Sequence, residues 1–166
     1  NFRRLVAGVK RQVRAEVGRH QRRPAVWVPG ETLVIDWGLH PSGLKVFCAV
    51  LAWSRFRFVR VARDETAATT MALLADCFDT LGGVPAQVLA DRMGCLKGGT
   101  VANVMIPTPD YVRFATHYRF VPDFCHPADP ESKGIVENLV GYAKRDLVLP
   151  DSDDLAVLND ACRDWC

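Results

Sequence analysis

The chain has 166 residues, of which 49% are hydrophobic and 24% are charged, and its formal net charge is +2. This is the composition of an ordinary globular domain that is long enough to bury a sizeable core. No apolar run approaches the roughly 18 residues that a membrane span requires, which excludes an integral membrane helix. Six irregularly spaced cysteines without a C-x-x-C pair indicate a reducing compartment, so we expect a cytoplasmic protein.

The charge is unevenly distributed. Residues 1–23 carry eight basic side chains against Glu16 alone, a net charge of +7, so the remainder carries −5. Apolar residues near a 3.6-residue period predict a helix over 2–20. We expect residues 1–30 to be a basic helical arm or linker that lies on a polyanion, with nucleic acid as the first candidate. A solvated linker helix is the alternative. Both chain ends also indicate a fragment of a longer protein.

Three strands are predicted next. Residues 32–38 read T-L-V-I-D-W-G and are expected to end at Gly38. Residues 44–53 form a nearly continuous apolar strand, of the kind that is buried on both faces. Residues 55–61 predict a third strand with one polar side. Together they predict an antiparallel meander.

Asp36 interrupts the first of these strands. Alternation places Val34 and Asp36 on one face and Ile35 and Trp37 on the other. Aspartate is depleted in strand interiors. Asp36 is therefore either hydrogen-bonded to a neighbouring turn or a metal ligand, and the strand alone does not decide between them.

A helix is expected over 65–81, with Asp64 as its N-cap. A short strand over 85–91 follows and ends on Asp91. Because a helix connects this strand to the meander, a parallel crossover is predicted. Ligand-binding residues in open α/β sheets gather at the carboxyl ends of such strands, which makes Asp91 a candidate site residue.

The rest of the chain completes the predicted fold. We expect a mobile or substrate-facing loop over 92–100, a helix over 108–118, a strand over 120–126 and a helix over 134–149, and an acidic stretch from Asp151 begins another helix. The order predicts an α/β fold with a five-stranded mixed sheet, three antiparallel strands followed by parallel ones, flanked by helices. The expected organisation is an arm (1–30), a core (31–150) and the start of a C-terminal segment (151–166).

Residues 127–138, P-A-D-P-E-S-K-G-I-V-E-N, combine a proline-rich loop with a helix start. Glu137 is expected about one turn into this helix, directly after the core residue Val136. Asp129 and Glu131 are competing acids, but a loop bounded by prolines fixes a carboxylate less well. Glu137 is therefore the preferred third acid.

Three acids on separate segments favour a site for two divalent cations. Mg²⁺ prefers oxygen ligands and takes one or two protein carboxylates, completing its shell with water and substrate phosphate. Two such ions about 3.5–4 Å apart support an in-line displacement at phosphorus. We expect structural or surface roles for the other acids and for the possible nitrogen and sulfur metal ligands: Asp64, Asp76, Asp79, His117, His126 and Cys125.

The motifs V-I-D-W-G (34–38), L-A-D (89–91) and P-x-x-P-x-S-K-G-x-V-E-N (127–138) resemble the catalytic core of DDE transposases of the retroviral integrase superfamily. The resemblance covers about 25–149 and is closest to IstA-type bacterial insertion-sequence transposases, in which P-G-E precedes the first acidic strand, as residues 29–31 do here. It implies a ribonuclease-H-like fold.

By this resemblance, Asp36, Asp91 and Glu137 are the catalytic metal ligands of a two-metal Mg²⁺ site, with Mn²⁺ as a substitute. The implied activity is cleavage at DNA 3′ ends followed by strand transfer. The implied partners are double-stranded DNA (transposon ends and target), further copies of the chain and an AAA+ ATPase helper, with no membrane. The implied location is the bacterial cytoplasm, in association with the nucleoid.

Five basic residues are expected to contact DNA: Lys133, Lys144, Arg145, Arg92 and Lys97. Solvated charges on the helix surface are the alternative for those on the last helix. Arg92 departs from the family pattern, because many relatives have Asn directly after the second acid. A cation there would either contact phosphate or weaken metal binding.

Two other functions fit the same sequence. One is a catalytically impaired descendant that keeps the fold for binding DNA or a partner. The other is a simple ribonuclease-H-like nuclease. The presence of all three acids favours the transposase, and the basic arm argues against the simple nuclease.

Overall fold

The computed structural model describes residues 27–91, 93–102, 104–125 and 130–166, with backbone only for 130–133. The predicted helix over 2–20, and the arm up to residue 26, lie outside the described residues. Among the residues that are described, no helix is long and apolar enough to cross a membrane.

Five strands form the central sheet in the order β3-β2-β1-β4-β7. Their bounds are β1 Thr32–Leu39, β2 Lys45–Leu51, β3 Arg57–Ala62, β4 Gln87–Ala90 and β7 Val121–Phe124. The first three strands are antiparallel, whereas β4 runs parallel to β1 and β7 runs parallel to β4. The predicted meander, parallel crossover and mixed sheet are confirmed.

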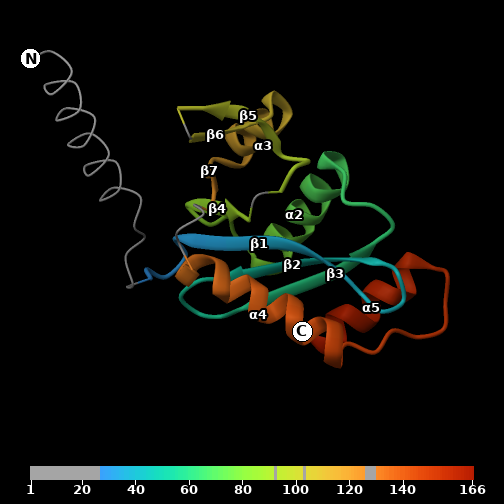
Figure 1. Ribbon diagram of the computed structural model, residues 1–166. Coiled ribbons are helices and arrows are strands. Elements are labelled where there is room, and N and C mark those ends of the chain that lie inside the picture. The colour runs from blue at the N-terminus through green and yellow to red at the C-terminus, as the bar shows by residue number, and fades with distance from the viewer. Residues whose placement is uncertain (1–26, 92, 103, 126–129) are drawn as a thin grey trace, which may run out of the picture.

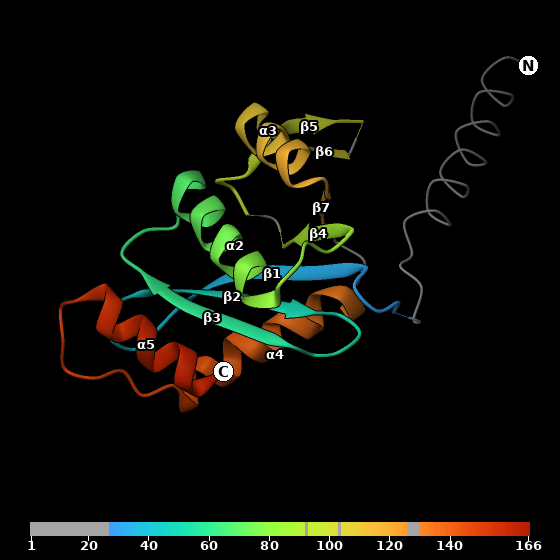
Figure 2. The same ribbon diagram turned by 180° about the vertical axis from the view of Figure 1, so that it is seen from behind.

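The helices lie on both sides of this sheet (Figures 1 and 2). Helices α2 (Ala67–Leu81) and α3 (Pro109–Tyr118) cover one face, and α4 (Pro130–Asp146) covers the other, along β1 and β2. Helix α5 (Leu155–Trp165) packs against β3. The predicted helix over 108–118 and the helix after Asp151 are thereby confirmed.

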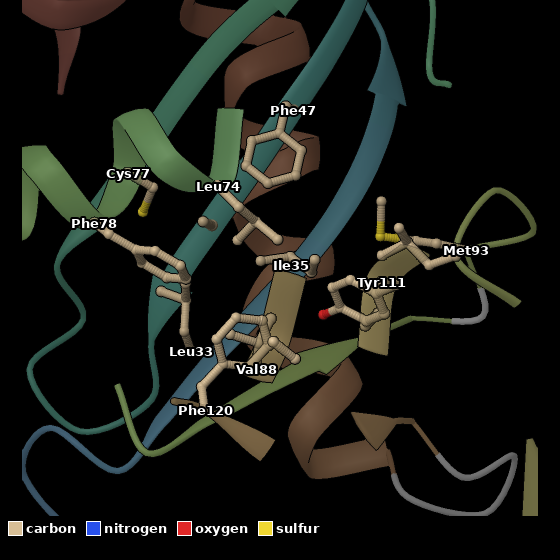
Figure 3. Packing of buried hydrophobic residues seen from close by; sticks show 14 of the residues in the cluster. Leu33, Ile35, Phe47, Leu74, Cys77, Phe78, Val88, Met93, Tyr111 and Phe120 are labelled. Atoms are coloured by element: carbon tan, nitrogen blue, oxygen red, sulfur yellow. The ribbon is translucent and has the colours of Figure 1, made fainter. Parts of the chain in front are cut away.

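Each face of the sheet has its own hydrophobic core. Under α2 and α3 lies the aromatic core, whose largest buried members are Phe47, Phe58, Phe78, Tyr111, Phe120 and Phe124. Figure 3 shows how Phe47, Phe78, Tyr111 and Phe120 pack there. Under α4 and α5 lies the aliphatic core, built from Val34, Val46, Cys48, Val50, Ala52, Val59, Val61, Leu89, Cys125, Val136, Leu139, Val140, Ala143, Leu147, Leu158 and Cys162. The alternation in β1 divides its side chains between the two, since Val34 belongs to the aliphatic core and Ile35 to the aromatic core.

The end of β1 and the N-cap of α2 differ from the sequence prediction for local reasons. Strand β1 continues through Gly38 to Leu39, so Gly38 does not end it. The N-cap of α2 is Thr66, whose side chain accepts from the backbone N of Thr69. Asp64 instead accepts from Thr66 N at 3.0 Å and from the Thr69 hydroxyl at 2.6 Å, which lowers the pKa of its carboxyl.

The prediction of a loop over 92–100 is wrong for the second half of that range. A two-stranded sheet forms there from β5 (Lys97–Val101) and β6 (Val104–Pro107). Gly98 lies so close to Pro107 that an added Cβ would be 3.0 Å from the Pro107 carbonyl oxygen. Glycine weakens a strand signal in sequence, and here it allows this close backbone approach.

Helix α5 closes the edge of the sheet. The Asn159 side chain accepts from the backbone N of Val61 at 2.8 Å and donates to the Val61 carbonyl oxygen at 3.0 Å. These two bonds reproduce what a neighbouring strand would offer to β3. An otherwise open strand edge is thereby covered, which protects it against pairing with another chain.

Candidate active site

Asp36 and Asp91 lie on adjacent parallel strands. Ile35 pairs with Ala90, and the backbone N of Asp91 donates to the Ile35 carbonyl oxygen at 3.1 Å, so the register continues to the two aspartates. Neighbouring strands are about 4.8 Å apart. The predicted pair of strand acids is therefore brought together at the backbone level.

Both aspartates share a face with the aliphatic core. Side chains alternate along a strand, and Val34 and Leu89, two residues before Asp36 and Asp91, are buried in that core. Both aspartates are half-buried. This is the face that α4 covers (Figure 1).

The carboxylate of Asp36 is held locally by its own strand. Its Oδ1 accepts from the backbone N of Trp37 at 2.8 Å. Cys48 lies opposite on β2. Burial raises the pKa of the Cys48 thiol, the negative charge of Asp36 raises it further, and Lys144 lowers it. Asp36 and Lys144 are thus both close enough to act on the same thiol.

Glu137 projects from α4, the helix on this face. Buried Val136, Leu139, Val140 and Ala143 seat the helix on the aliphatic core, and Glu137 itself is exposed. The helix begins at Pro130, not Gly134, and ends at Asp146 rather than near Leu149, so Glu137 lies about two turns into it and not one. Proline is favoured in a first helical turn, and glycine in a helix interior is not, which explains the misplaced start.

Helix α4 runs in the same direction as β1. Val140 and Lys144 lie over Gly38. Further along both elements, the ring nitrogen Nε2 of His40 is 3.0 Å from the carbonyl oxygen of Leu147. Glu137 precedes Val140 by about one helical turn, and Asp36 precedes Gly38 by two strand residues. Glu137 therefore lies towards the Asp36 end of this contact.

The donor set fits a hard divalent cation, since three carboxylates offer the oxygen ligands that Mg²⁺ prefers. The placement of these three carboxylates meets the requirements of such a site only in part. Asp36 and Asp91 are register neighbours, and Glu137 comes from the covering helix of the same face. Within the described part of the chain, however, no group of three His, Cys, Asp or Glu side chains is arranged so that it could hold a metal ion.

The predicted DNA-contacting residues are only partly visible. Lys144 and Arg145 are exposed in the last turn of α4, and Lys97 is exposed at the start of β5. Arg92 and the side chain of Lys133 lie outside the described residues. The same holds for the competing acid Asp129 and the side chain of Glu131.

The other residues considered as alternatives lie in structural or surface positions. Asp76 forms an ion pair with the buried Arg60 at 2.8 Å, while Asp79 and His117 are exposed on α2 and α3 and Cys125 is buried in the aliphatic core. His126 lies outside the described residues.

Three residues of this face were not selected from the sequence. Gly38 and His40 share the alternation of Asp36, and that period-two signal could have found them. Asp123, on β7, pairs in register with Leu89 and so points to the same face. Its carboxylate accepts from Gln87 Nε2 at 2.8 Å and from the backbone N of Phe124 at 2.8 Å. Nothing in its local sequence pattern distinguishes it.

Known proteins similar to this chain include transposases of insertion sequence elements. It is 31% identical over 123 residues to a putative transposase for insertion sequence element IS5376 of Geobacillus stearothermophilus, covering 69% of this chain and 31% of that protein. It is 34% identical over 122 residues to the transposase for insertion sequence element IS21-like of Bacteroides fragilis, covering 72% and 23%. The chain thus spans about a quarter to a third of these relatives. No family model matches it.

Solved structures define the class of fold. The catalytic core domain of BIV integrase superposes with a TM-score of 0.60 at 16% identity, over 80% of this chain and 81% of that one. The HTLV-2 integrase catalytic core domain in complex with magnesium gives 0.53 at 17% identity, over 81% and 84%. The fold is the ribonuclease-H-like fold of integrase catalytic cores. Together with the transposase relatives, this fold supports a DDE transposase catalytic core.

Proposed function

We propose that this chain is the catalytic core for cleavage at DNA 3′ ends and for strand transfer of those ends into target DNA. Asp36, Asp91 and Glu137 would be the ligands of two Mg²⁺ ions, with Mn²⁺ able to replace them. The observation that carries the proposal is the adjacency of Asp36 and Asp91 on the face that the Glu137 helix covers.

The two metal ions, when bound, would activate an attacking oxygen and stabilise a leaving one at phosphorus. The protein contributes the placement of the ligands. Two carboxylates come from hydrogen-bonded neighbouring strands and therefore keep a fixed separation. The third comes from a helix, so the seating of α4 on β1 sets how closely Glu137 approaches the pair.

DNA is the proposed substrate, with its backbone contacted by Lys144, Arg145 and Lys97 and by Arg92 and Lys133. Such contacts position a duplex but do not read its sequence. They also make binding weaken steeply as salt is raised. The proposal includes assembly of several copies on DNA, an AAA+ ATPase helper and a cytoplasmic location at the nucleoid, all of which rest on the resemblance to insertion-sequence transposases.

The test is strand transfer of pre-cut DNA ends with Mg²⁺ by the protein and by its Asp36→Asn, Asp91→Asn and Glu137→Gln variants. Loss of a metal ligand is expected to lower the rate about a thousandfold or more. DNA affinity, measured by fluorescence anisotropy, is expected to stay unchanged. Asp79→Asn, an exposed acid on the opposite side of the sheet, is the control and should join ends normally. Normal joining by Asp36→Asn or Glu137→Gln would contradict the assignment.

One observation favours a second candidate, a DNA-binding descendant without catalysis. The three acids do not form a metal-holding group within the described residues. That protein would bind DNA with the same salt dependence and would join no ends under any metal condition. The wild-type arm of the same assay separates the two functions.

A further inference from the structure

Three exposed apolar side chains share one face of the β5–β6 hairpin. Val101 pairs with Val104 in register, and Ile106 follows Val104 by two residues, so alternation places all three on the same side. Their exposed fractions are 63%, 58% and 41%. Gly99 pairs with Ile106, and a Cβ added to Gly99 would meet nothing within 4 Å. No described residue therefore lies over this part of the face, which we call the outer face of the hairpin.

The opposite face fixes the hairpin to the domain. Met105 alternates with Val104 and Ile106 and packs against the aromatic core. At the base of the hairpin, the backbone N of Thr108 donates to the Leu96 carbonyl oxygen at 2.8 Å, and Leu96 is fully buried in the same core. The hairpin is therefore a supported two-stranded ribbon, and its outer face is turned away from the core that would otherwise bury such side chains.

The hairpin also lies in a basic part of the chain. Residues 92–119 contain four basic side chains and one acid, a net charge of +3. These residues are Arg92, Lys97, Arg113, Arg119 and Asp110. Since residues 24–166 carry −5 in total, the rest of them carries −8. In space the hairpin lies on the opposite side of the sheet from α4 and α5 (Figures 1 and 2). Its surroundings therefore suit a polyanion.

DNA suits this face better than a second copy of the chain does. A two-fold pairing of identical hairpins would bring two surfaces of like charge together, which is unfavourable. Three side chains are also far fewer than the roughly 20–30 residues on each side of a stable protein interface. DNA offers negative charge and a matching shape, because its major groove admits a two-stranded β-ribbon. The thymine methyl groups in that groove offer apolar side chains a surface to contact.

We propose that the β5–β6 hairpin enters the major groove of duplex DNA with its outer face and contacts thymine methyl groups through Val101, Val104 and Ile106. The inference rests on the proposed function, in which DNA is the substrate. Residues 92–96 separate Asp91 from β5, a reach of at most about 20 Å. The hairpin thus holds the duplex within one helical turn of Asp91. Unlike phosphate contacts, such contacts read base sequence.

The experiment measures binding of the 166-residue chain to a thymine-rich duplex by fluorescence anisotropy. A second duplex has deoxyuridine in place of every thymidine and so lacks the methyl groups alone. The wild type is expected to bind the thymidine duplex more tightly, by about fourfold for each methyl group that the hairpin buries. Val101→Ser/Val104→Ser is expected to bind the two duplexes equally, with thermal unfolding as the measure of folding.

A pair of charged variants at one site separates a groove contact from damage to the hairpin. Val104→Glu places a carboxylate towards the phosphates and is expected to weaken binding of both duplexes about tenfold or more. Val104→Lys disturbs the apolar face equally but is expected to bind at least as tightly as the wild type. Val157→Glu, at an exposed position of α5, is the matched control for net charge. Equal affinities of these three variants would overturn the proposal.

The remaining outcomes distinguish this proposal from the proposed function. If ends are joined but the wild type and the serine variant bind both duplexes equally, the role of the hairpin is overturned and the proposed function stands. If the hairpin variants behave as expected but the wild type joins no ends, the hairpin binds DNA and the proposed catalysis fails. If the serine variant changes the oligomeric state in analytical ultracentrifugation and leaves DNA binding unaltered, the face is an interface between copies, which also overturns the proposal.

Discussion

The two faces of the central sheet are built from different side chains. On the α2 and α3 side, large rings interlock: Phe47 meets Trp37 at a centroid distance of 5.2 Å and Phe58 at 6.3 Å, both edge-to-face. On the α4 and α5 side, the buried hydrophobic residues that the structure describes are Val, Leu, Ala and Cys. The candidate ligands Asp36, Asp91 and Glu137 belong to this second side.

This difference in side chains indicates that the two faces of the sheet have separate roles. Aromatic rings bury the most area per residue and dominate core energetics. Small aliphatic residues and a glycine let a helix lie close to a strand, which leaves the polar groups of both elements within reach of one another. We therefore expect the aromatic core to determine stability and the aliphatic core to determine the geometry of the site.

The largest expected effect comes from the aromatic core. Phe47→Ala should lower the free energy of unfolding by about 3–5 kcal/mol, because a fully buried ring is lost and a cavity remains. Urea unfolding measures it. Val46→Ala, the next residue on the same strand but in the aliphatic core, should cost only about 2 kcal/mol. Mn²⁺ affinity of the folded Phe47→Ala protein should be unchanged, and a tenfold loss would contradict the division of tasks.

A substitution at His40 tests the hydrogen bond between His40 and Leu147 on the other face of the sheet. His40→Ala removes a hydrogen bond to the Leu147 carbonyl oxygen and should lower the free energy of unfolding by about 1–3 kcal/mol. Unlike Phe47→Ala, it should also weaken Mn²⁺ binding, since α4 is released from β1 at its end. His117→Ala, on an exposed site of α3, is the control and should change stability by less than about 0.5 kcal/mol. Equal free energies of unfolding for the two histidine variants would show that the His40–Leu147 hydrogen bond does not stabilise the fold.

A buried thiol on each face gives a pH-dependent comparison. Burial raises the pKa of Cys77, in the aromatic core, to about 12 and that of Cys162, in the aliphatic core, to about 11. Above their ordinary value of 9.0, the unfolded chain loses these protons first and holds fewer than the folded protein. Stability must then fall as pH rises, by about 1.4 kcal/mol per pH unit for each thiol.

Urea unfolding between pH 9 and about 11 measures that slope. Cys77→Ala and Cys162→Ala should each reduce it by the contribution of one thiol, whatever they do to stability at neutral pH. Cys166→Ala, at an exposed position, should reduce it less. An unchanged slope in Cys77→Ala would mean that its thiol ionises equally in both states.

The sequence predicts the sheet because its signals are local. Alternation in 32–38 gives the face of Asp36, and the helix between the meander and β4 gives the parallel crossover that brings Asp91 alongside. The sequence signals for helix α3 are equally local, since Thr108 caps the helix and Pro109 occupies its first turn.

The features that were not predicted depend on contacts between distant segments. The β5–β6 hairpin is rich in glycine, whose strand propensity is poor, and only its close approach to Pro107 reveals why. Gly38 gives the local signal of a strand end, although its actual requirement is the presence of Val140 about a hundred residues later. The position of Glu137 relative to Asp36 and Asp91 likewise depends on how α4 packs on the sheet, which no spacing in the sequence specifies.

The smallest expected effect concerns a polar group in the aromatic core. Tyr111 is fully buried there (Figure 3), and within the described residues its hydroxyl has no hydrogen-bond partner. Burial also raises the pKa of this phenol. A buried polar group without a partner costs about 1–3 kcal/mol, whereas its removal from a ring of the same shape leaves the packing intact.

Tyr111→Phe should therefore raise the free energy of unfolding by about 1 kcal/mol, the reverse sign of every other core substitution above. Tyr118→Phe, a half-buried tyrosine at the end of the same helix, is the matched control and should be neutral. A loss of stability in Tyr111→Phe would mean that the hydroxyl is hydrogen-bonded after all. The aromatic core would then contain a polar contact of its own, and the contrast with the face of Asp36 would be one of side-chain size alone.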